Sequence, residues 1–563
     1  MTGIPGSRPV GNQGYTSSTV VIIGAGISGL CMAIEILNRS QCRNILLLEK
    51  GSQVGGTWND NKYPGCACDV WGALYSFSFE QKSDWAREYP GQEEIRDYVI
   101  HVAEKYGLYK YIRFNTAVQE ARWDNDHRQW KVNVAVSGYK DSQFHESYQI
   151  TTDFLVSAVG QLNIPSWPSI PGLDDFTGKL MHSARWDLTY DFIGKRVAII
   201  GNGATSAQIT SELAKSVSQL TVYQRTPNWV IPRHDASISP VQKFLLSYVP
   251  PIRWCKRAIQ MQYREAIHEA TVRKSDSWLA RYMRKMAVDA MQTQLRDKPG
   301  LWAKLVPNYS SGCKRIILSD DYFAALNRDH VHLETRPIQR VTGYGIETAD
   351  GDLREYDLII VATGFRSVEF MYPIQVYGQN GRPLSEVWKD GASAYYGVTV
   401  EDLPNFGMLY GPNTNLGHNS IIVMIEAQSR YLSTLIAEVV RAKAHGNSLV
   451  LQPRPDVVAT FNDRIQAELR ESTFADPNCH SWYKLENGRI TNNWPGLAVR
   501  YQREMSRVRW EDYLVEGTGK SRVQGKKATH IGRVQEELPV RTTTLVLSAL
   551  GVAFAVSAYY LEF

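Results

Sequence analysis

Three patterns in the sequence predict an α/β protein. Two glycine-rich turns, at residues 24–29 and 201–206, each follow a short apolar run typical of a buried strand and precede a helical pattern. Residues 278–291 place apolar side chains at helical spacing, and residues 542–561 contain no charge. We therefore predict two Rossmann-like dinucleotide-binding domains, a helical insertion and a C-terminal transmembrane helix.

The composition is that of an ordinary globular protein. Apolar residues make up 43% and charged residues 21% of the 563 residues, which excludes a disordered chain, a collagen-like fibre and a multi-span membrane protein. The net charge of +5 gives no reason to expect a nucleic acid as partner. Seven cysteines without a C-x-x-C pair predict neither a disulfide framework nor a metal site, and they favour a reducing compartment.

The first glycine-rich turn is typical of a site for a dinucleotide with a free ribose hydroxyl. Gly24, Gly26 and Gly29 form a G-x-G-x-x-G sequence, which lets backbone amides and a helix N-terminus approach a pyrophosphate. Glu49 ends the next apolar run, where a carboxylate can accept hydrogen bonds from a ribose. The acid favours FAD or NAD over NADP, because it would repel a 2′-phosphate.

The second turn is followed by a different chemistry. Gly201 and Gly203 are kept, but Ser206 replaces the third glycine, so the turn alone is the weaker signal. The next strand ends in Arg225 and Thr226 in place of an acid. Because a guanidinium suits a 2′-phosphate, we predict NADPH at this site. In one site the second strand ends in an acid, and in the other it ends in an arginine. Two such sites in a single chain indicate hydride transfer from NADPH to FAD.

Two longer motifs connect the chain to a known family. Residues 176–187 read F-x-G-x-x-x-H-x-x-x-W-D, and residues 55–69 read G-G-T-W-x-x-N-x-Y-P-G-x-x-x-D. Both resemble signatures of the type I Baeyer–Villiger monooxygenases, and the resemblance runs from about residue 20 to residue 494. It is strongest to fungal members. The related N- and S-oxygenating flavoenzymes usually carry tyrosine where Trp186 stands.

The resemblance implies roles for individual residues. By similarity, Arg315 is the active-site arginine over the flavin and Asp69 is the carboxylate bonded to it. Lys314 is expected to hold the 2′-phosphate together with Arg225 and Thr226. The other cofactor-binding residues are expected to be Gly56, Thr57, Trp58 and Tyr75 at the first site, Thr205 and Gln208 at the second, and Trp482 on a loop that closes over the cofactor.

The resemblance also implies a reaction. NADPH would reduce FAD, O2 would add to the reduced flavin, and the resulting anion would attack a ketone to give an ester or lactone. Arg315 suits this chemistry, because a guanidinium keeps its charge at every accessible pH. The expected substrate is a large, apolar, polycyclic ketone of secondary metabolism. Two alternatives stay open: a flavin-dependent N- or S-oxygenase, and a membrane-anchored scaffold without activity.

The motifs also divide the chain. The expected parts are a disordered lead over 1–17, an FAD-binding domain over 18–175 and 367–514, an NADPH-binding domain over 176–237 and 308–366, a helical insertion over 238–307, a linker over 515–541 and a membrane anchor over 542–561.

The anchor rests on length and flanking charge. As a helix with a rise of ~1.5 Å per residue, residues 542–561 would span roughly 30 Å, the thickness of the bilayer core. Lysines and arginines are frequent in residues 520–541, which precede this segment. By the positive-inside rule the catalytic body would then lie in the cytoplasm, on the face of the endoplasmic reticulum. The alternative is a buried C-terminal helix of the globular core.

Overall fold

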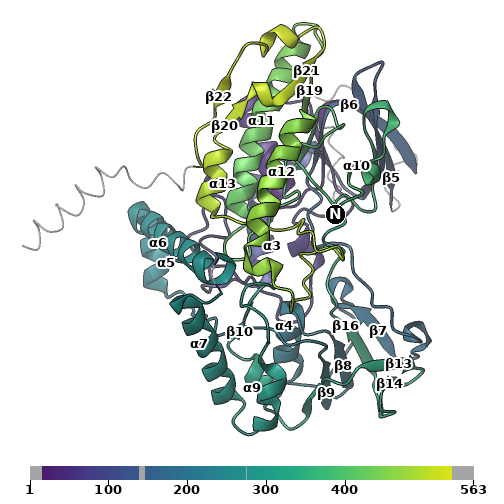
Figure 1. Cartoon of the computed structure of the whole chain (residues 1–563), viewed down its shortest axis with the longest axis vertical. Helices are drawn as coiled ribbons and strands as arrows, with labels where there is room; N and C mark the ends of the chain where they lie inside the picture. Colours follow the sequence, from purple (N-terminus) through teal and green to yellow (C-terminus); the bar gives the residue numbers. More distant parts are fainter. Residues whose placement is uncertain (1–15, 138–145, 274, 535–563) are drawn as a thin grey trace, which may run out of the picture.

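Two β-sheets organise the chain (Figure 1). The computed structural model describes residues 16–137, 146–273 and 275–534. The larger sheet has eight strands and lies in the upper half of Figure 1, and a five-stranded sheet lies in the lower half. Each sheet contains one of the two strand–turn–helix units predicted from the sequence.

In the larger sheet, β1 pairs in parallel with β2 on one side and β6 on the other, so that Val21 is opposite both Leu46 and Leu155. Apart from its first residue, β1 is buried, which explains why a central strand appears as a continuous apolar run. The strands are β17 (Gln375–Tyr377), β4 (Thr116–Asp124), β5 (Gln129–Val136), β6 (Ser147–Ser157), β1 (Ser17–Ile23), β2 (Ile45–Leu48) and β3 (Ile112–Arg113), with β18 (Phe406–Met408) beside β6.

The smaller sheet is parallel throughout. Its central strand β8 pairs with β9 and β16, and Ile199 lies opposite Val222 and Ile360. These side chains join a buried core with those of the helix that follows β8. In sheet order the strands are β12 (Val331–Glu334), β9 (Gln219–Tyr223), β8 (Arg196–Ile200), β16 (Leu358–Val361) and β7 (Lys179–His182).

Segments far apart in sequence complete each unit. The long helix α11 (Ile422–Ala444) packs against α1 (Ile27–Glu35), the helix of the first glycine turn. The short helix α9 (Tyr322–Leu326) packs against α4 (Ala204–Leu213), the helix of the second turn. Both units are therefore closed by chain that follows the insertion.

The insertion is helical, as its periodicity predicts. It contains α5 (Pro240–Tyr248), α6 (Pro250–His268), a π-helical turn at Glu269–Arg273 and α7 (Trp278–Gln294). In α7 the buried face contains Ala287 and Met291, whereas Trp278 is exposed. These helices lie at the left of Figure 1, alongside both halves of the molecule.

The remaining elements are short or cover the surface. The helices are α2 (Thr57–Asp60), α3 (Gln92–Lys105), α8 (Trp302–Leu305), α10 (Leu384–Val387), α12 (Pro455–Arg470) and α13 (Ala498–Glu504). The strands are β10 (Val230–Ile231), β11 (Ile317–Leu318), β13 (Ile338–Thr342), β14 (Gly345–Thr348), β15 (Leu353–Glu355), β19 (Val450–Pro453), β20 (Arg507–Arg509), β21 (Tyr513–Glu516) and β22 (Ala528–His530).

The predicted fold class needs one correction, which concerns the transmembrane helix. Among the described residues, no helix combines the length and the apolar character that crossing a membrane requires. The expected anchor, residues 542–561, lies outside the described residues. The described residues therefore form a two-domain α/β fold with a helical insertion.

The two ends of the described chain also differ from expectation. The lead was expected to reach residue 17, but β1 begins at Ser17, which pairs with Thr151. The linker was expected from residue 515, but β22 lies within it and pairs with β20, with Arg507 opposite His530. Strands as short as β22 have too few residues to show an alternating pattern in the sequence.

Candidate active site

The first glycine turn joins β1 to α1 and leaves little room for side chains. Gly24 has a positive φ of 103°, and a Cβ there would lie 2.7 Å from the carbonyl oxygen of Ala158. A Cβ on Gly29 would lie 2.0 Å from the carbonyl oxygen of Gly24. The first and third glycines of the motif are therefore required by the packing of the turn itself.

The second glycine of the motif lies close to another glycine, Gly56. The Cβ positions of Gly26 and Gly56 would each approach the other residue's Cα, at 3.5 and 3.2 Å. Two bare backbones thus form one wall of a cavity, beside the N-terminus of α1. Such a cradle fits a pyrophosphate, which must approach the backbone amides closely.

Glu49 follows β2 at the edge of the same cavity. Its carboxylate accepts hydrogen bonds from the backbone N–H groups of Ala25 (2.8 Å) and Gly51 (2.7 Å). Burial raises the pKa of Glu49, although these two N–H groups act in the opposite direction. An acid fixed at this place can accept hydrogen bonds from a ribose, as the sequence predicts.

The G-G-T-W segment lies directly over this cradle. Thr57 starts α2, and the indole N–H of Trp58 donates to the hydroxyl of Tyr75 at 3.0 Å. The two rings meet edge to face with centroids 5.4 Å apart. Thr57, Trp58 and Tyr75 all line the cavity, so the structure places these predicted residues beside the glycine turn.

Arg315 and Asp69 form an ion pair in the wall of the cavity, although 246 residues separate them in sequence. The guanidinium binds the carboxylate through two hydrogen bonds, Nε to Oδ2 and Nη2 to Oδ1, the latter at 2.6 Å. About a quarter of each side chain stays exposed, 29% for Arg315 and 25% for Asp69. The pair is therefore fixed in orientation and still open to a ligand.

Each partner of this pair stabilises the charge of the other. Burial alone would raise the pKa of Asp69, but the adjacent Arg315 guanidinium holds it below its usual value. Burial would likewise lower the pKa of Arg315, but Asp69 raises it above its ordinary value. Both groups are thus charged across the whole working pH range, and a bidentate guanidinium cannot rotate away from its place.

The second glycine turn joins β8 to α4. Gly201 has a φ of 112°, and a Cβ there would lie 2.5 Å from the carbonyl oxygen of Ala362. Around Gly203, in contrast, a Cβ would find no atom within 4 Å. The open space beside Gly203, at the N-terminus of α4, is the place where a second pyrophosphate fits.

Lys314, Arg225 and Thr226 gather beyond β9, where the 2′-phosphate was predicted. The ammonium group of Lys314 donates to the hydroxyl of Thr226 at 2.9 Å, and Arg225 is exposed. Burial, assisted by the nearby charge of Arg225, lowers the pKa of Lys314 to about 8. A lysine whose pKa is lowered partly by a neighbouring guanidinium is a good complement to a phosphate dianion, which would restore its proton.

Gln208 connects the two dinucleotide cradles. Its side-chain N–H donates to the carbonyl of Ala67 at 3.0 Å, and its side-chain oxygen accepts from the hydroxyl of Tyr63 at 2.9 Å. Ala67 and Tyr63 belong to the predicted motif of residues 55–69. Gln208 and Thr205 both line the cavity that begins at Gly24, so one space extends from the first turn to the second.

Twelve of the predicted residues line a single cavity of about 450 Å³. Those that line it are Gly24, Gly26, Glu49, Gly56, Thr57, Trp58, Asp69, Tyr75, Thr205, Gln208, Arg315 and Trp482. Trp482 is 39% exposed and lies at the edge of this cavity. The residues that do not line it are Gly29, Gly201, Gly203, Arg225, Thr226 and Lys314.

Sequence reasoning missed the contribution of the insertion to this site. Arg264, on α6, donates to the backbone carbonyl of Asp69 at 3.0 Å and stacks over the ring of Trp71. Its neighbour Glu265 accepts a hydrogen bond from Asn419 at 2.6 Å. The signal was present: Arg257, Arg264 and Glu265 have the spacing of one helix face, and charged residues on an inward face need buried partners.

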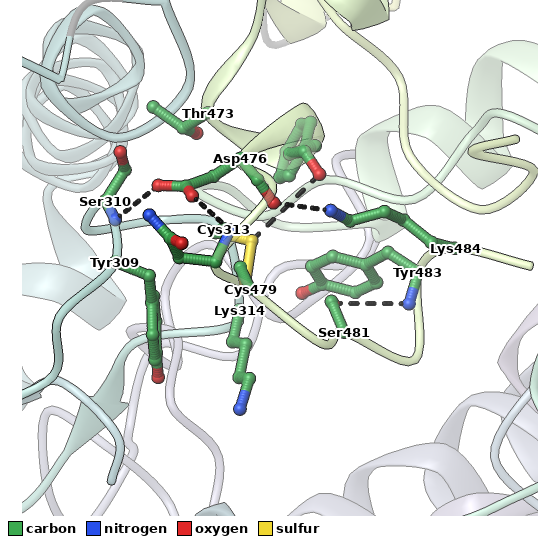
Figure 2. Close-up of a disulfide and its surroundings, with 12 residues drawn as sticks. Tyr309, Ser310, Cys313, Lys314, Thr473, Asp476, Cys479, Ser481, Tyr483 and Lys484 are labelled. Carbon is green, nitrogen blue, oxygen red and sulfur yellow. Dashed lines mark hydrogen bonds between the residues drawn. A yellow bond between two sulfur atoms is a disulfide. The ribbon is translucent and has the colours of Figure 1, made fainter. Parts of the chain in front are cut away.

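The expectation that the cysteines form no disulfide is wrong. Cys313 and Cys479 are joined by a disulfide bond, drawn in Figure 2, across 166 residues. Neither residue belongs to a short Cys-x-x-Cys motif, and a pairing over such a distance leaves no mark in the sequence. Cys313 directly precedes Lys314 and Arg315, so the bond is attached to the segment that carries both predicted cations.

Together these features define a class of protein. Two β-sheet units each carry a glycine turn that leads into a helix. The first turn and the start of the second helix line one cavity, and an arginine–carboxylate pair lies in its wall. This is the arrangement of a two-dinucleotide flavoenzyme, in which a nicotinamide cofactor and a flavin meet in the same space.

Comparison with known proteins identifies the family. The family model described as flavin-binding monooxygenase-like matches residues 17–376. The FAD-binding monooxygenase ktnD of Aspergillus niger is 60% identical over 98% of this chain and 90% of its own length. A Baeyer–Villiger monooxygenase of Streptomyces coelicolor is 39% identical over 90% of this chain and 95% of its own length. The chain therefore belongs to the flavin-binding monooxygenase-like family.

A solved structure shows the same fold with both cofactors. The crystal structure of OTEMO in complex with FAD and NADP superimposes with a TM-score of 0.76 and 27% identity, over 89% of this chain and 99% of that one. The predicted resemblance, including that to fungal relatives, is confirmed. The chain is an enzyme, a flavin-dependent monooxygenase of the Baeyer–Villiger type, and the prediction of FAD and NADPH as its cofactors is confirmed.

The lowered pKa of Lys314 makes NADP+ binding pH-dependent. The free enzyme loses the Lys314 proton as the pH rises through about 8, whereas a bound 2′-phosphate would hold the proton on. We therefore expect the Kd for NADP+ to rise by about tenfold between pH 7 and pH 9. Equilibrium dialysis at several pH values measures this, with NAD+, which lacks the 2′-phosphate, as the control ligand. An equal pH dependence for both nucleotides, or an unchanged dependence in Lys314→Met, would contradict the assignment.

Proposed function

We propose that the enzyme inserts one oxygen atom of O2 next to the carbonyl of a large, apolar ketone and releases an ester or a lactone. The observation that supports this most directly is the Arg315–Asp69 pair in the wall of a cavity shared by both dinucleotide cradles. A fixed positive charge at that place suits a reaction in which negative charge develops on oxygen.

The chain's own residues would hold both cofactors. The turn at Gly24 and Gly26, with Gly56 opposite, would take the FAD pyrophosphate, and Glu49 its ribose. The turn at Gly201 and Gly203 would take the NADPH pyrophosphate, and the group of Lys314, Arg225 and Thr226 its 2′-phosphate. When both are bound, NADPH supplies the hydride that lets FAD activate O2.

Arg315 would bind and stabilise charge rather than move a proton. Asp69 raises its pKa above the ordinary value, so the guanidinium keeps its proton throughout the reaction. Asp69 also sets its orientation through two hydrogen bonds, while 29% of the side chain stays exposed towards the cavity. Arg264 in turn holds the backbone of Asp69, which connects the insertion to the orientation of the arginine. Such a preorganised cation needs no rearrangement when charge develops.

The lining of the cavity near Arg315 favours an apolar substrate. Val70, Ile421, Ile425 and the ring of Trp482 line the same space as Arg315. Apolar and aromatic walls with few polar groups bind a bulky hydrocarbon skeleton, and the cation then orients its carbonyl. The apolar lining supports a large apolar ketone, and the resemblance to fungal members of the family is the reason to propose a polycyclic ketone of secondary metabolism.

The mass of the product tests this function. The purified enzyme with NADPH and O2 is offered a panel of polycyclic ketones, and in a separate reaction a thioether of similar size. The proposed function predicts ester or lactone, 16 mass units above the ketone by the addition of one oxygen atom, with one NADPH consumed per product. Sulfoxide from the thioether, with no ester from any ketone, would show a heteroatom oxygenase instead.

A further inference from the structure

The Cys313–Cys479 disulfide connects the arginine segment to the loop that carries Trp482 (Figure 2). Cys313 is fully buried and is followed at once by Lys314 and Arg315. Cys479 is 3% exposed and lies three residues before Trp482, which lines the cavity. One covalent bond therefore joins a loop in the cavity wall to the segment that carries Lys314 and Arg315.

The loop is also anchored by hydrogen bonds to the segment before Cys313, within itself and to the insertion. Asp476 accepts a hydrogen bond from the backbone N–H of Ser310 at 2.8 Å, and Lys484 donates to the carbonyl of Asp476 at 2.8 Å (Figure 2). The hydroxyl of Thr473 bonds the carbonyl of Thr271 at 2.6 Å. From residue 476 to residue 490 the backbone forms no helix or strand. Such a segment keeps its place only as long as its anchors hold.

Cys479 is buried but close to solvent. Its neighbours Asn478 and His480 are both exposed, so a local opening of the loop is enough to expose the sulfur. The other five cysteines of the chain are free thiols, including Cys66 and Cys68 in the wall of the same cavity. One pair of cysteines is therefore oxidised while the other five are not, and this pair differs from them by its position next to the Arg315 segment.

We propose that Cys313 and Cys479 are a reversible redox pair that controls how tightly the enzyme holds NADP. In the disulfide form, the bond keeps Trp482 and Tyr483 beside the Arg315 end of the cavity. A dithiol reductant breaks the S–S bond: it supplies two electrons and two protons, the enzyme gains two thiols, and the reductant closes its own disulfide. The freed loop then opens more often, and NADP+ leaves the site faster.

Tyr483 shows how closely the loop and the arginine are coupled. Burial raises the pKa of Tyr483 to about 12, against the opposing influence of the Arg315 charge. Its ring packs edge to face on Phe474, with the centroids 5.6 Å apart, on the same side as the disulfide. Release of Cys479 would therefore loosen not only the loop but also an aromatic side chain that interacts with the Arg315 guanidinium.

The FAD-loaded enzyme provides the first part of the test. Iodoacetamide labelling after denaturation, followed by mass spectrometry, is expected to leave Cys313 and Cys479 unlabelled before dithiothreitol and labelled after it. Hydrogen–deuterium exchange of residues 476–490 is expected to rise after reduction, with α11 unchanged. Labelling of both cysteines in enzyme oxidised beforehand would overturn the proposal, because the pair would then not form.

The second part measures nucleotide binding. Reduction is expected to raise the Kd for NADP+ at least tenfold, and Cys313→Ser/Cys479→Ser should behave as reduced enzyme with or without dithiothreitol. The control is Cys255→Ser, which removes an exposed thiol on α6 and should keep the full response. An unchanged Kd after complete reduction would overturn the proposal and leave the bond a structural link only. No readout uses a ketone, so failure here is distinct from failure of the proposed substrate.

Discussion

Arg315→Ala is expected to lower the rate of ester formation at least 100- to 1000-fold while FAD stays bound. Removal of one well-placed donor from an oxygen anion costs about that much in other enzymes, and Arg315 offers a full charge as well. The cradle of Gly24, Gly26 and Glu49 does not involve the arginine, so the flavin should still be retained. Product quantification by mass spectrometry, with the flavin absorbance as the measure of loading, checks both halves of the prediction.

Arg315→Ala removes both the positive charge and the structural contact with Asp69, and a second variant separates the two losses. Alanine leaves Asp69 as a carboxylate without its bidentate partner, and this alone can disturb the site. Arg315→Lys keeps a charge but offers a single ammonium in place of a fork. Beside Asp69 an ammonium would keep its charge, but it could not bind both carboxylate oxygens in the fixed geometry of the guanidinium. We therefore expect Arg315→Lys to form ester more slowly than wild type and faster than Arg315→Ala, which separates the loss of the charge from the loss of the bidentate contact.

A matched control comes from an arginine outside the site. Arg96 forms an exposed ion pair with Asp97 on α3, and surface pairs of this kind contribute little to stability. Arg96→Ala should keep wild-type ester formation. Undiminished ester formation by Arg315→Ala would show that the arginine is not the catalytic cation, whatever its contacts in the structure.

The sequence predicts those parts of the site in which local backbone chemistry sets the choice of residue. Gly24 and Gly201 adopt positive φ values beside a carbonyl, so few other residues fit, and the motif can be read without any structure. The Arg315–Asp69 pair spans 246 residues and was reached through family resemblance, because spacing alone carries no signal over such a distance. Local patterns predict local geometry, whereas long-range partners need either relatives or coordinates.

The features that were missed are all long-range. Arg264 reaches Asp69 from the helical insertion, which its apolar periodicity marked only as a packed subdomain. Cys313 and Cys479 meet because the fold brings the ends of two distant segments together. The membrane anchor was predicted from the length and flanking charge of residues 542–561, which lie outside the described residues, and no helix in the described part of the chain is long and apolar enough to cross a membrane. A short stretch of sequence does not determine which distant residues it contacts in the fold or whether it meets a membrane.

Replacement of the two glycines of the NADPH turn by alanine should affect different properties: stability at Gly201 and NADP+ binding at Gly203. At Gly201 the φ of 112° is unfavourable for alanine, and the new Cβ would lie 2.5 Å from a backbone oxygen. We expect Gly201→Ala to reduce the free energy of unfolding by about 2–4 kcal/mol, from the left-handed backbone and the steric overlap together. Thermal or denaturant unfolding of the FAD-loaded enzyme measures this loss.

Gly203→Ala tests cofactor binding separately from the stability of the fold. Gly203 has a φ of −73°, close to the −78° of its counterpart Gly26 in the first turn. Alanine adopts this backbone conformation readily. A Cβ at Gly203 meets nothing in the protein, so the free energy of unfolding should stay within about 0.5 kcal/mol of wild type. The methyl group would instead occupy space that the pyrophosphate needs, and the Kd for NADP+ should rise at least tenfold. If Gly203→Ala binds NADP+ as tightly as wild type, the pyrophosphate does not lie over this turn, and the orientation proposed for NADPH is wrong even though the fold is right.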